Sequence, residues 1–408
     1  MGKIESIKSY DGQVLDNIFF RPMLTGKSAE ELGIKVMYNV PVPTTLHFWK
    51  RKGDVLKKYT SGGWSGGAPA DKYQKEIHLN KVKAEMAYSA EDYFSTVYEL
   101  ITGRPDVNLD DLSGTELEEA ETSLFRASIA ESIRATMWYG DSKREALGTF
   151  DGFLKRICED VESDTGIVQM AYHPQNDSYE WAEALLKKMW EGSTEELRAL
   201  RSEGNLAFFV SSDIYNAYEE SLDNVALESA YIAKQTGRDS LYFRGIPILD
   251  VQMNGYKHLC ENLPHSFAIL TDRRNLALAV NTSDFPGTEV RMWYNPDQME
   301  NRQRAIFMAG CDYLLPELVT VAVGLPFTYL WSEYNDGSLS IQAIFDEKQS
   351  WGSSVKLYVC DYEGEMQIDG VELQPSDGMI DESFSLSSFS HGWLEVSSED
   401  GFTIKYQL

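Results

Sequence analysis

The sequence predicts an α+β protein that carries an all-β domain at its C-terminal end. The chain has 408 residues, of which 43% are hydrophobic and 12% aromatic, which is ample for well-buried cores. This length exceeds what one compact core usually holds, so we expect two or three subdomains. Alternating strand patterns surround one long amphipathic segment, and from about residue 325 short alternating runs stand between Ser, Asp, Glu and Gly. Together these observations predict helices and strands first, and strands alone afterwards.

The first part of the chain predicts an arm followed by a hairpin. Residues 1–43 read as an irregular arm, because "VPVP" at 40–43 cannot be helical. In "TTLHFWKRKGDVLKKYT", apolar and polar residues alternate on either side of Lys-Gly-Asp, which predicts a long exposed hairpin. Its basic side chains are Lys50, Arg51, Lys52, Lys57 and Lys58. The Gly-rich stretch 61–73 predicts a connector, and it is no P-loop because no Gly-Lys-Ser/Thr follows its glycines.

A half-buried strand over 75–89 and a long helix over 115–139 come next. Thr115 and Glu118 have the spacing of a capping box, and apolar residues recur at three- to five-residue intervals from Leu117 to Met137. We expect Gly140 to end the helix. Four glutamates lie at its positive end, namely Glu116, Glu118, Glu119 and Glu121.

The middle of the chain has an α/β pattern. Helices are expected within 178–192, 193–204 and 213–222, with Asp213 placed to cap the last of these. Apolar or alternating runs predict strands within 206–211, 240–251, 267–280, 287–296 and 302–324. After residue 325 the regular spacing of strands and turns predicts a small sandwich or barrel.

Charge is distributed unevenly along the chain. The formal net charge is −27, yet residues 1–60 hold ten basic and six acidic residues, whereas 325–408 hold three basic and fifteen acidic ones. Such asymmetry suggests surfaces of opposite sign that meet within a chain or between copies, although a negative surface also simply keeps a protein soluble. The acidity argues against wrapping nucleic acid through a general basic surface. The N-terminus has no apolar signal region and no run is long enough to span a bilayer, so we expect no membrane and a cytoplasmic site of synthesis.

The sequence gives little sign of catalytic or metal chemistry. Hydrolase and metalloprotease motifs are absent, and the many carboxylate pairs are expected in so acidic a chain, so we expect no enzyme and no cofactor. His258, Cys260 and His265 form a loose group, but a zinc site needs a fourth ligand, so we expect no metal. The cysteines are widely spaced beside apolar residues and read as buried thiols in a reducing compartment: Cys158, Cys260, Cys311 and Cys360.

The order of these pieces resembles the tailed-bacteriophage major capsid proteins, whose shell fold is named after phage Hong Kong 97. Local stretches that carry the resemblance are "LFRASIAESIRATMWYGD", "LAFFVSSDIYNAYEESL", "LYFRGIPILDV", "FAILTDRRNLALAV" and "EVRMWYNPDQMENRQRAIFMAGCDYLLPELVTVAVG". They are most similar to versions from phages of Bacteroides-like hosts and cover about residues 40–324. Each stretch is a packing pattern and not a chemical signature, so their shared order is the specific signal.

The resemblance implies a Hong Kong 97-like capsid fold and a structural role. Many copies would form hexamers and pentamers of an icosahedral virion shell around double-stranded DNA, assembled in the host cytoplasm. Implied partners are other copies, a portal, and scaffolding or decoration proteins. The sequence shows no long helical scaffolding segment before the arm, so we expect any scaffold to be a separate protein or absent, and nothing in the sequence supports a covalent cross-link. The implied divisions are an N-terminal arm (1–43), an E-loop hairpin with its connector (44–74), a peripheral domain with the spine helix (75–164), an axial domain (165–285), return strands of the peripheral domain (286–324), and an acidic C-terminal domain outside the family core (325–408).

A hypothesis about assembly follows from the charges. A hairpin with few apolar residues and a basic tip cannot be held by its own core. We expect it to rest over the glutamate-rich helix start, Glu116 to Glu121, of the next copy. Exposed ion pairs are worth only about 0–1 kcal/mol each, so they set orientation more than strength.

Three other functions remain open from the residues. An encapsulin-like nanocompartment shell shares the lineage but packages enzymes. A carbohydrate-binding or hydrolytic protein with a C-terminal β-sandwich would use the abundant aromatic residues. A nucleic-acid-binding protein would use the basic hairpin, with Trp49 and Tyr59 as aromatic support.

Overall fold

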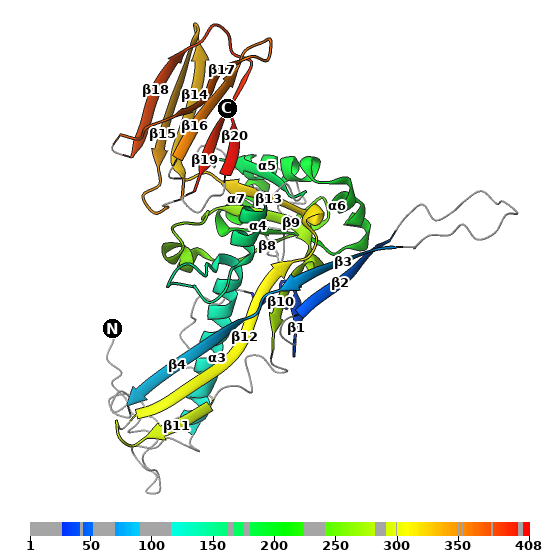
Figure 1. The fold of residues 1–408 in the computed structure, drawn as a ribbon, viewed down its shortest axis with the longest axis vertical. Coiled ribbons are helices and arrows are strands. Elements are labelled where there is room, and N and C mark those ends of the chain that lie inside the picture. The colour runs from blue at the N-terminus through cyan, green and yellow to red at the C-terminus, as the bar shows by residue number, and fades with distance from the viewer. Residues whose placement is uncertain are drawn as a thin grey trace, which may run out of the picture.

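The protein is elongated and has three parts, a long sheet with its helix, a central α/β body and an all-β domain at the opposite end (Figure 1). The computed structural model describes residues 27–40, 44–51, 70–89, 116–161, 166–173, 180–223, 241–281, 291–298, 300–349, 351–352, 354–376, 378–398 and 403–408.

A five-stranded sheet, hereafter the long sheet, is built on β12, which pairs with β4, β10 and β11, while β1 adds to β10 in parallel. β4 and β12 run antiparallel from the pair Ser89–Glu300 to the pair Asn80–Ala309. The strands are β1 (Lys35–Met37), β4 (Asn80–Ser89), β10 (Leu276–Val280), β11 (Arg291–Asn295) and β12 (Glu300–Tyr313).

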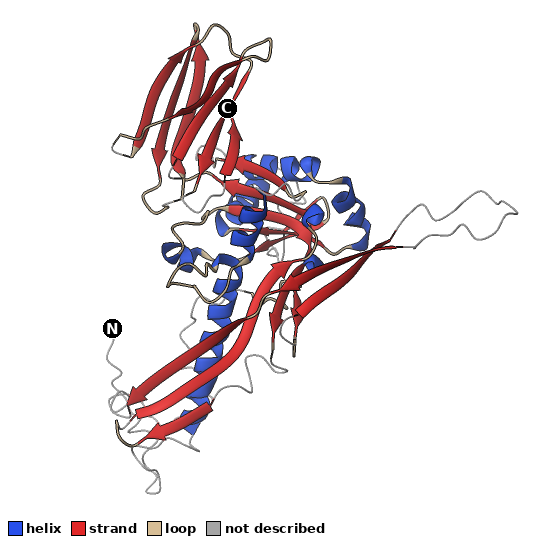
Figure 2. Cartoon of the chain, viewed as in Figure 1, coloured by secondary structure: helices blue, strands red, loops and turns tan. Residues whose placement is uncertain are grey.

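Helix α3 (Glu116–Tyr139) is the long helix expected over 115–139, and it covers one face of the long sheet (Figure 2). Phe125, Ile129 and Ile133 pack in the same buried cluster as Phe307 of β12. Gly140 follows the last helical residue, but its φ is not left-handed. A Cβ there would lie 2.2 Å from the Phe150 carbonyl oxygen, so close packing and not a left-handed cap requires the glycine.

A six-stranded sheet of order β5-β13-β9-β6-β8-β7 forms the centre of the body. Trp138 of α3 and Phe153 of α4 pack against one face, with ring centroids 5.6 Å apart, and α5 and α7 share a second core on the other face. The strands are β5 (Val168–Tyr172), β6 (Leu206–Val210), β7 (Leu241–Phe243), β8 (Ile246–Asp250), β9 (Phe267–Asp272) and β13 (Val319–Gly324). The helices are α4 (Phe153–Val161), α5 (Glu180–Gly192), α6 (Glu195–Ala199) and α7 (Ser212–Asp223).

The described residues beyond 325 form two antiparallel sheets, hereafter the sandwich. Leu339 and Ile341 of one sheet and Leu357 and Val359 of the other are buried in the same cluster, alternating with more exposed neighbours. The first sheet contains β14 (Phe327–Asn335), β15 (Ser338–Phe345) and β18 (Met379–Ser385). The second contains β16 (Ser354–Cys360), β17 (Met366–Glu372), β19 (His391–Ser397) and β20 (Thr403–Gln407).

The sandwich packs directly against the body. One hydrophobic cluster contains buried residues of the body and of the sandwich alike. Trp351, only 1% exposed, donates its backbone N–H to the Glu261 carbonyl at 3.2 Å, and β20 lies beside β5. The sandwich is therefore attached through a continuous core.

Two features of the N-terminal half differ from the prediction. β2 (Thr44–Arg51) pairs with β3 (Ala70–Ile77) and not with the run that follows Lys52-Gly53-Asp54, and that expected turn lies outside the described residues. Part of the expected Gly-rich connector is thus strand, and the run 75–89 is two strands. The chain was expected to reverse at the first turn-forming residues, but the pairing that forms joins segments much further apart in the sequence.

Two strands belong to a different sheet from the strand that precedes them in the chain. β10 lies within the range 165–285 but belongs to the long sheet, and β13 lies within 286–324 but belongs to the six-stranded sheet. The chain changes sheet at the short turns Arg273–Asn275 and Pro316–Leu318, where no composition shift marks the crossing.

Asp213 does not cap α7 as expected, because the helix begins one residue earlier and Asp213 lies in its first turn. Its Oδ2 accepts a hydrogen bond from the Ser266 hydroxyl, which ties the helix start to β9. Among the described helices, none is long and apolar enough to cross a membrane.

Candidate assembly surface

β2 and β3 form a two-stranded ribbon that projects from the body (Figure 1). Its register runs from Thr44–Ile77 at the root to Arg51–Ala70 at the outer end of the described part. An isolated pair of strands is marginally stable in water. The ribbon therefore depends on contacts at its root or with another molecule.

Lys75 provides the charged contact between the root of the ribbon and β12. Lys75 Nζ lies 2.9 Å from Asp312 Oδ1 and donates to the Tyr313 carbonyl oxygen at 2.7 Å. The same ammonium group stands 3.7 Å from the centroid of the Tyr313 ring. Arg156 Nη1 approaches the other oxygen of Asp312 at 3.5 Å, so this buried carboxylate has two cationic neighbours.

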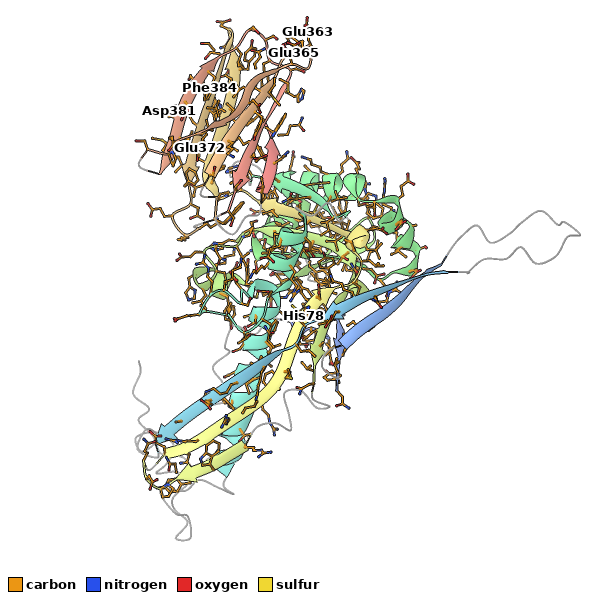
Figure 3. The ribbon with its side chains drawn as sticks, in the orientation of Figure 1. His78, Glu363, Glu365, Glu372, Asp381 and Phe384 are labelled. Atoms are coloured by element: carbon orange, nitrogen blue, oxygen red, sulfur yellow. The ribbon has the colours of Figure 1, made fainter. Side chains whose placement is uncertain are left out.

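The chain then turns closely over β12 at His78, which Figure 3 labels at this junction. A Cβ on Gly310 would lie 2.2 Å from the His78 carbonyl oxygen, so only glycine allows this approach. Ile77 is fully buried in a small cluster with Val40, Leu79 and Ala277, on the face of the sheet opposite α3. Charge and apolar packing together determine where the ribbon leaves the body.

Two of the five basic residues predicted as a contact lie at the outer end of the described ribbon. Lys50 and Arg51 are the last residues of β2, opposite Asp71 and Ala70. Lys52, Lys57 and Lys58 lie outside the described residues.

The predicted acidic group belongs to the start of α3. Glu116, Glu118, Glu119 and Glu121 fall in its first two turns. Figure 1 draws this end of α3 at the far end of the long sheet from the ribbon, so one chain does not bring the outer end of β2 and the start of α3 together.

A second charged group holds α3 and α4 in the body. Lys155 is buried and its Nζ lies 2.6 Å from Asp141 Oδ1 and 2.8 Å from Asp151 Oδ1. Asn262 donates to the other oxygen of Asp141 at 2.8 Å. Burial alone would raise the pKa of both aspartates, but the hydrogen bonds from Lys155 lower it below the usual value.

The sequence signal for Lys75 is weak because Asp312 lies far along the chain. Lys155 lies near its partners, and its i,i+4 spacing to Asp151 and Glu159 is a visible pattern. Its contact with Asp141, and the bond from Asn262 to that aspartate, depend on the fold.

The cysteines and His265 are buried. All four cysteines are free and buried, which confirms the expected thiols. Burial raises the pKa of Cys158 and of Cys260 to about 12, so both thiols stay neutral and unreactive at physiological pH. His265 Nε2 lies 3.2 Å from the Cys260 carbonyl oxygen, and no group of three or more potential metal ligands occurs within the described part of the chain.

Comparison with known proteins gives structural neighbours alone. No protein-family profile matches the chain, and no curated protein matches its sequence. A structure of the satellite phage P4 procapsid including size determination (Sid) protein is similar at 9% identity with a TM-score of 0.48, covering 79% of this chain and 93% of that one.

Two further capsid structures have comparable values. The capsid of the native GTA particle is 12% identical with a TM-score of 0.47, covering 79% of this chain and 95% of that one. The capsid of Myoviridae phage XM1 is 12% identical with a TM-score of 0.45, covering 79% and 97%. Structures similar to this chain thus include phage capsids.

Proposed function

We propose that this chain is the major capsid protein of a tailed phage, a structural subunit without catalytic function. Many copies form hexamers and pentamers of an icosahedral shell that encloses double-stranded DNA. Portal and scaffolding or decoration proteins join the particle, which assembles in the host cytoplasm. The order of elements over residues 40–324 supports this proposal, because it is the order of pieces on which the resemblance to the tailed-phage capsid proteins rests.

The observation that carries the proposal is the ribbon. β2 and β3 pair only with each other among the described strands, and they extend from the body beyond the root held by Lys75. A subunit with such an extension gains by laying it on a neighbour, because the unpaired edges and the charges then find partners. Contacts in which different patches of identical subunits meet generate rings and closed assemblies.

Within the subunit, we propose that β10 belongs with the peripheral part and β13 with the axial part. The peripheral part is then the long sheet with α3, and the axial part is the six-stranded sheet with α5 and α7. The sandwich is a third part added after the family core. The ribbon of one copy lies over the glutamate-rich start of α3 in the next.

The test of the function is expression of the full chain, followed by size exclusion and negative-stain microscopy. We expect capsomers or closed shells. A clean monomer at high concentration, with and without the other structural proteins of its phage, would contradict the proposal.

The ribbon contact has its own test. Replacing Lys50, Arg51 and Lys52 by Glu should block or misdirect assembly while the circular dichroism spectrum stays unchanged. The triple change Lys187→Glu, Lys188→Glu and Arg198→Glu, at exposed positions of α5 and α6, is the matched control. Normal assembly of the ribbon variant at low salt would show that the contact is wrong.

A further inference from the structure

The long sheet has two faces of different character. Along β12 the odd-numbered residues Asn301, Gln303, Ala305 and Phe307 are buried on the α3 side. The even-numbered residues face away from the helix and are more exposed. In β4 and β11, the residues paired with even-numbered residues of β12 therefore also face away from α3. These outward residues are hereafter the outer face.

The outer face is basic on an acidic protein. Its cations are Lys81, Lys83, Arg291, Arg302 and Arg304, and its carboxylates are Glu85 and Glu300. The cations outnumber the carboxylates although the whole chain carries a formal net charge of −27. Lys83 and Arg304 have side chains that are 56% and 45% exposed.

Within the described residues, ion pairs leave the positive charge of the outer face only partly compensated, because its five cations share two carboxylates, and Glu300 pairs with Arg302 at 3.4 Å. Glu85 is shared between Lys83, at 2.7 Å, and Arg304, at 3.3 Å. The hydrogen bond from Lys83 lowers the pKa of Glu85, so this carboxylate is ionised and its single negative charge is shared between two cations. Arg291 stands directly opposite Arg304 on the neighbouring strand, and like charges in that position destabilise a sheet. An incoming anionic surface would relieve this repulsion.

The other outward residues indicate a protein partner. Trp293 lies opposite Arg302 and is 41% exposed, and Ile306 is half-buried further along β12. Arginine and tryptophan are the residues most enriched at the energetic centres of protein interfaces. A duplex offers no unstacked base for an exposed indole, and carboxylates within the face would repel its phosphates.

We propose that the outer face binds an acidic surface of a second copy of this chain. The proposal rests on the proposed shell function, since that function supplies neighbouring copies. The chain provides suitable surfaces, because residues 325–408 contain fifteen acidic and three basic residues. This contact is separate from the ribbon, which is itself basic and needs its own acidic partner.

The test is the double variant Arg291→Glu, Arg304→Glu in the full chain. We expect the assembled fraction at low salt to fall by about tenfold, which is the effect of a lost charge contact. The matched control Lys187→Glu, Lys188→Glu changes the net charge equally at exposed positions of α5 and should assemble like the wild type. The milder variant Arg291→Gln, Arg304→Gln should give an intermediate loss, and its thermal unfolding shows whether the subunit stays folded.

Other outcomes separate this proposal from its alternatives. If the wild type and the double variant assemble equally, the outer face is no interface and the inference fails while the shell function stands. If the variant assembles normally but loses retention of duplex DNA in a filter assay, the face binds DNA and the inference also fails. If the wild type forms no shells, sedimentation equilibrium at low salt still decides, because the outer face then predicts self-association that the variant lacks.

Discussion

At the scale of single residues, Lys155 shows how this acidic protein uses a buried cation. Its ammonium group lies between Asp141 and Asp151, which follow the end of α3 and precede α4. Removing one partner of a buried ion pair leaves a desolvated charge, which is costly even where the intact pair contributes little. The residue thus fixes the joint between α3 and α4.

We predict that Lys155→Met lowers the free energy of unfolding by about 3–5 kcal/mol, because two carboxylates lose their cation. Urea denaturation followed by circular dichroism measures the change. Lys187→Met on the exposed side of α5 is the control and should shift the value by about 0.5 kcal/mol or less. An equal effect of both variants would contradict a role for the buried pair.

The same group predicts a pH dependence. The folded-state pKa values of Asp141 and Asp151 lie below their usual values, because the hydrogen bonds from Lys155 outweigh the effect of burial. Their contribution to stability is therefore complete above the unfolded pKa of about 3.9 and is lost as pH falls further. The wild type therefore changes little between pH 7 and pH 4. In Lys155→Met the cation is missing, so burial raises the pKa of both aspartates, and their protonation as the pH falls towards 4 removes the unpaired charge. The stability difference between wild type and variant should shrink as urea titrations move from pH 7 to pH 4, and a constant difference would contradict the assignment.

At the scale of elements, the root of the ribbon is set by one ion pair and one apolar cluster. Lys75 contacts Asp312 and Tyr313, while Ile77 is buried two residues further along β3. The strands beyond this point have no described partner other than each other. The direction of the ribbon therefore depends on very few contacts.

We predict that Lys75→Ala loosens the ribbon while the body stays folded. Amide hydrogen exchange in β2 and β3 should accelerate, and the free energy of unfolding should fall by about 1–3 kcal/mol because Asp312 loses a charged hydrogen-bond partner. Lys35→Ala, at an exposed position of β1 in the same sheet, is the control. Unchanged exchange in β3 would show that Ile77 alone holds the root.

At the scale of the whole molecule, the sandwich and the body share a core. The Trp351 indole donates to Gln349 Oε1 at 2.9 Å, and that oxygen also accepts from the His265 backbone N–H at 3.3 Å. Leu325 donates its backbone N–H to the Tyr172 carbonyl at 2.9 Å. Such a junction holds the sandwich in a fixed orientation.

We predict that the wild-type chain unfolds without a separate transition for the sandwich, whereas Trp351→Ala separates the two. Losing a fully buried tryptophan costs about 3–5 kcal/mol at the junction. Scanning calorimetry should show an earlier, smaller transition in the variant. Tyr362→Ala, at a side chain that is 76% exposed, should leave the profile unchanged. Two transitions already present in the wild type would mean that the parts are independent.

The periodicity of the sequence by itself determined the elements whose signals are local. The helix at 116–139, the helices α5 and α7, the buried cysteines and the strands after 325 follow from residues within a few positions of one another. Only the tertiary structure decided which strands pair. β2 pairs with β3 and not with the run nearest to it in the sequence, and the chain changes sheet before β10 and before β13, because pairing depends on burial and hydrogen bonding between distant segments. The basic outer face is visible only once that register is known, since a shift of one residue would reverse which side chains share a surface.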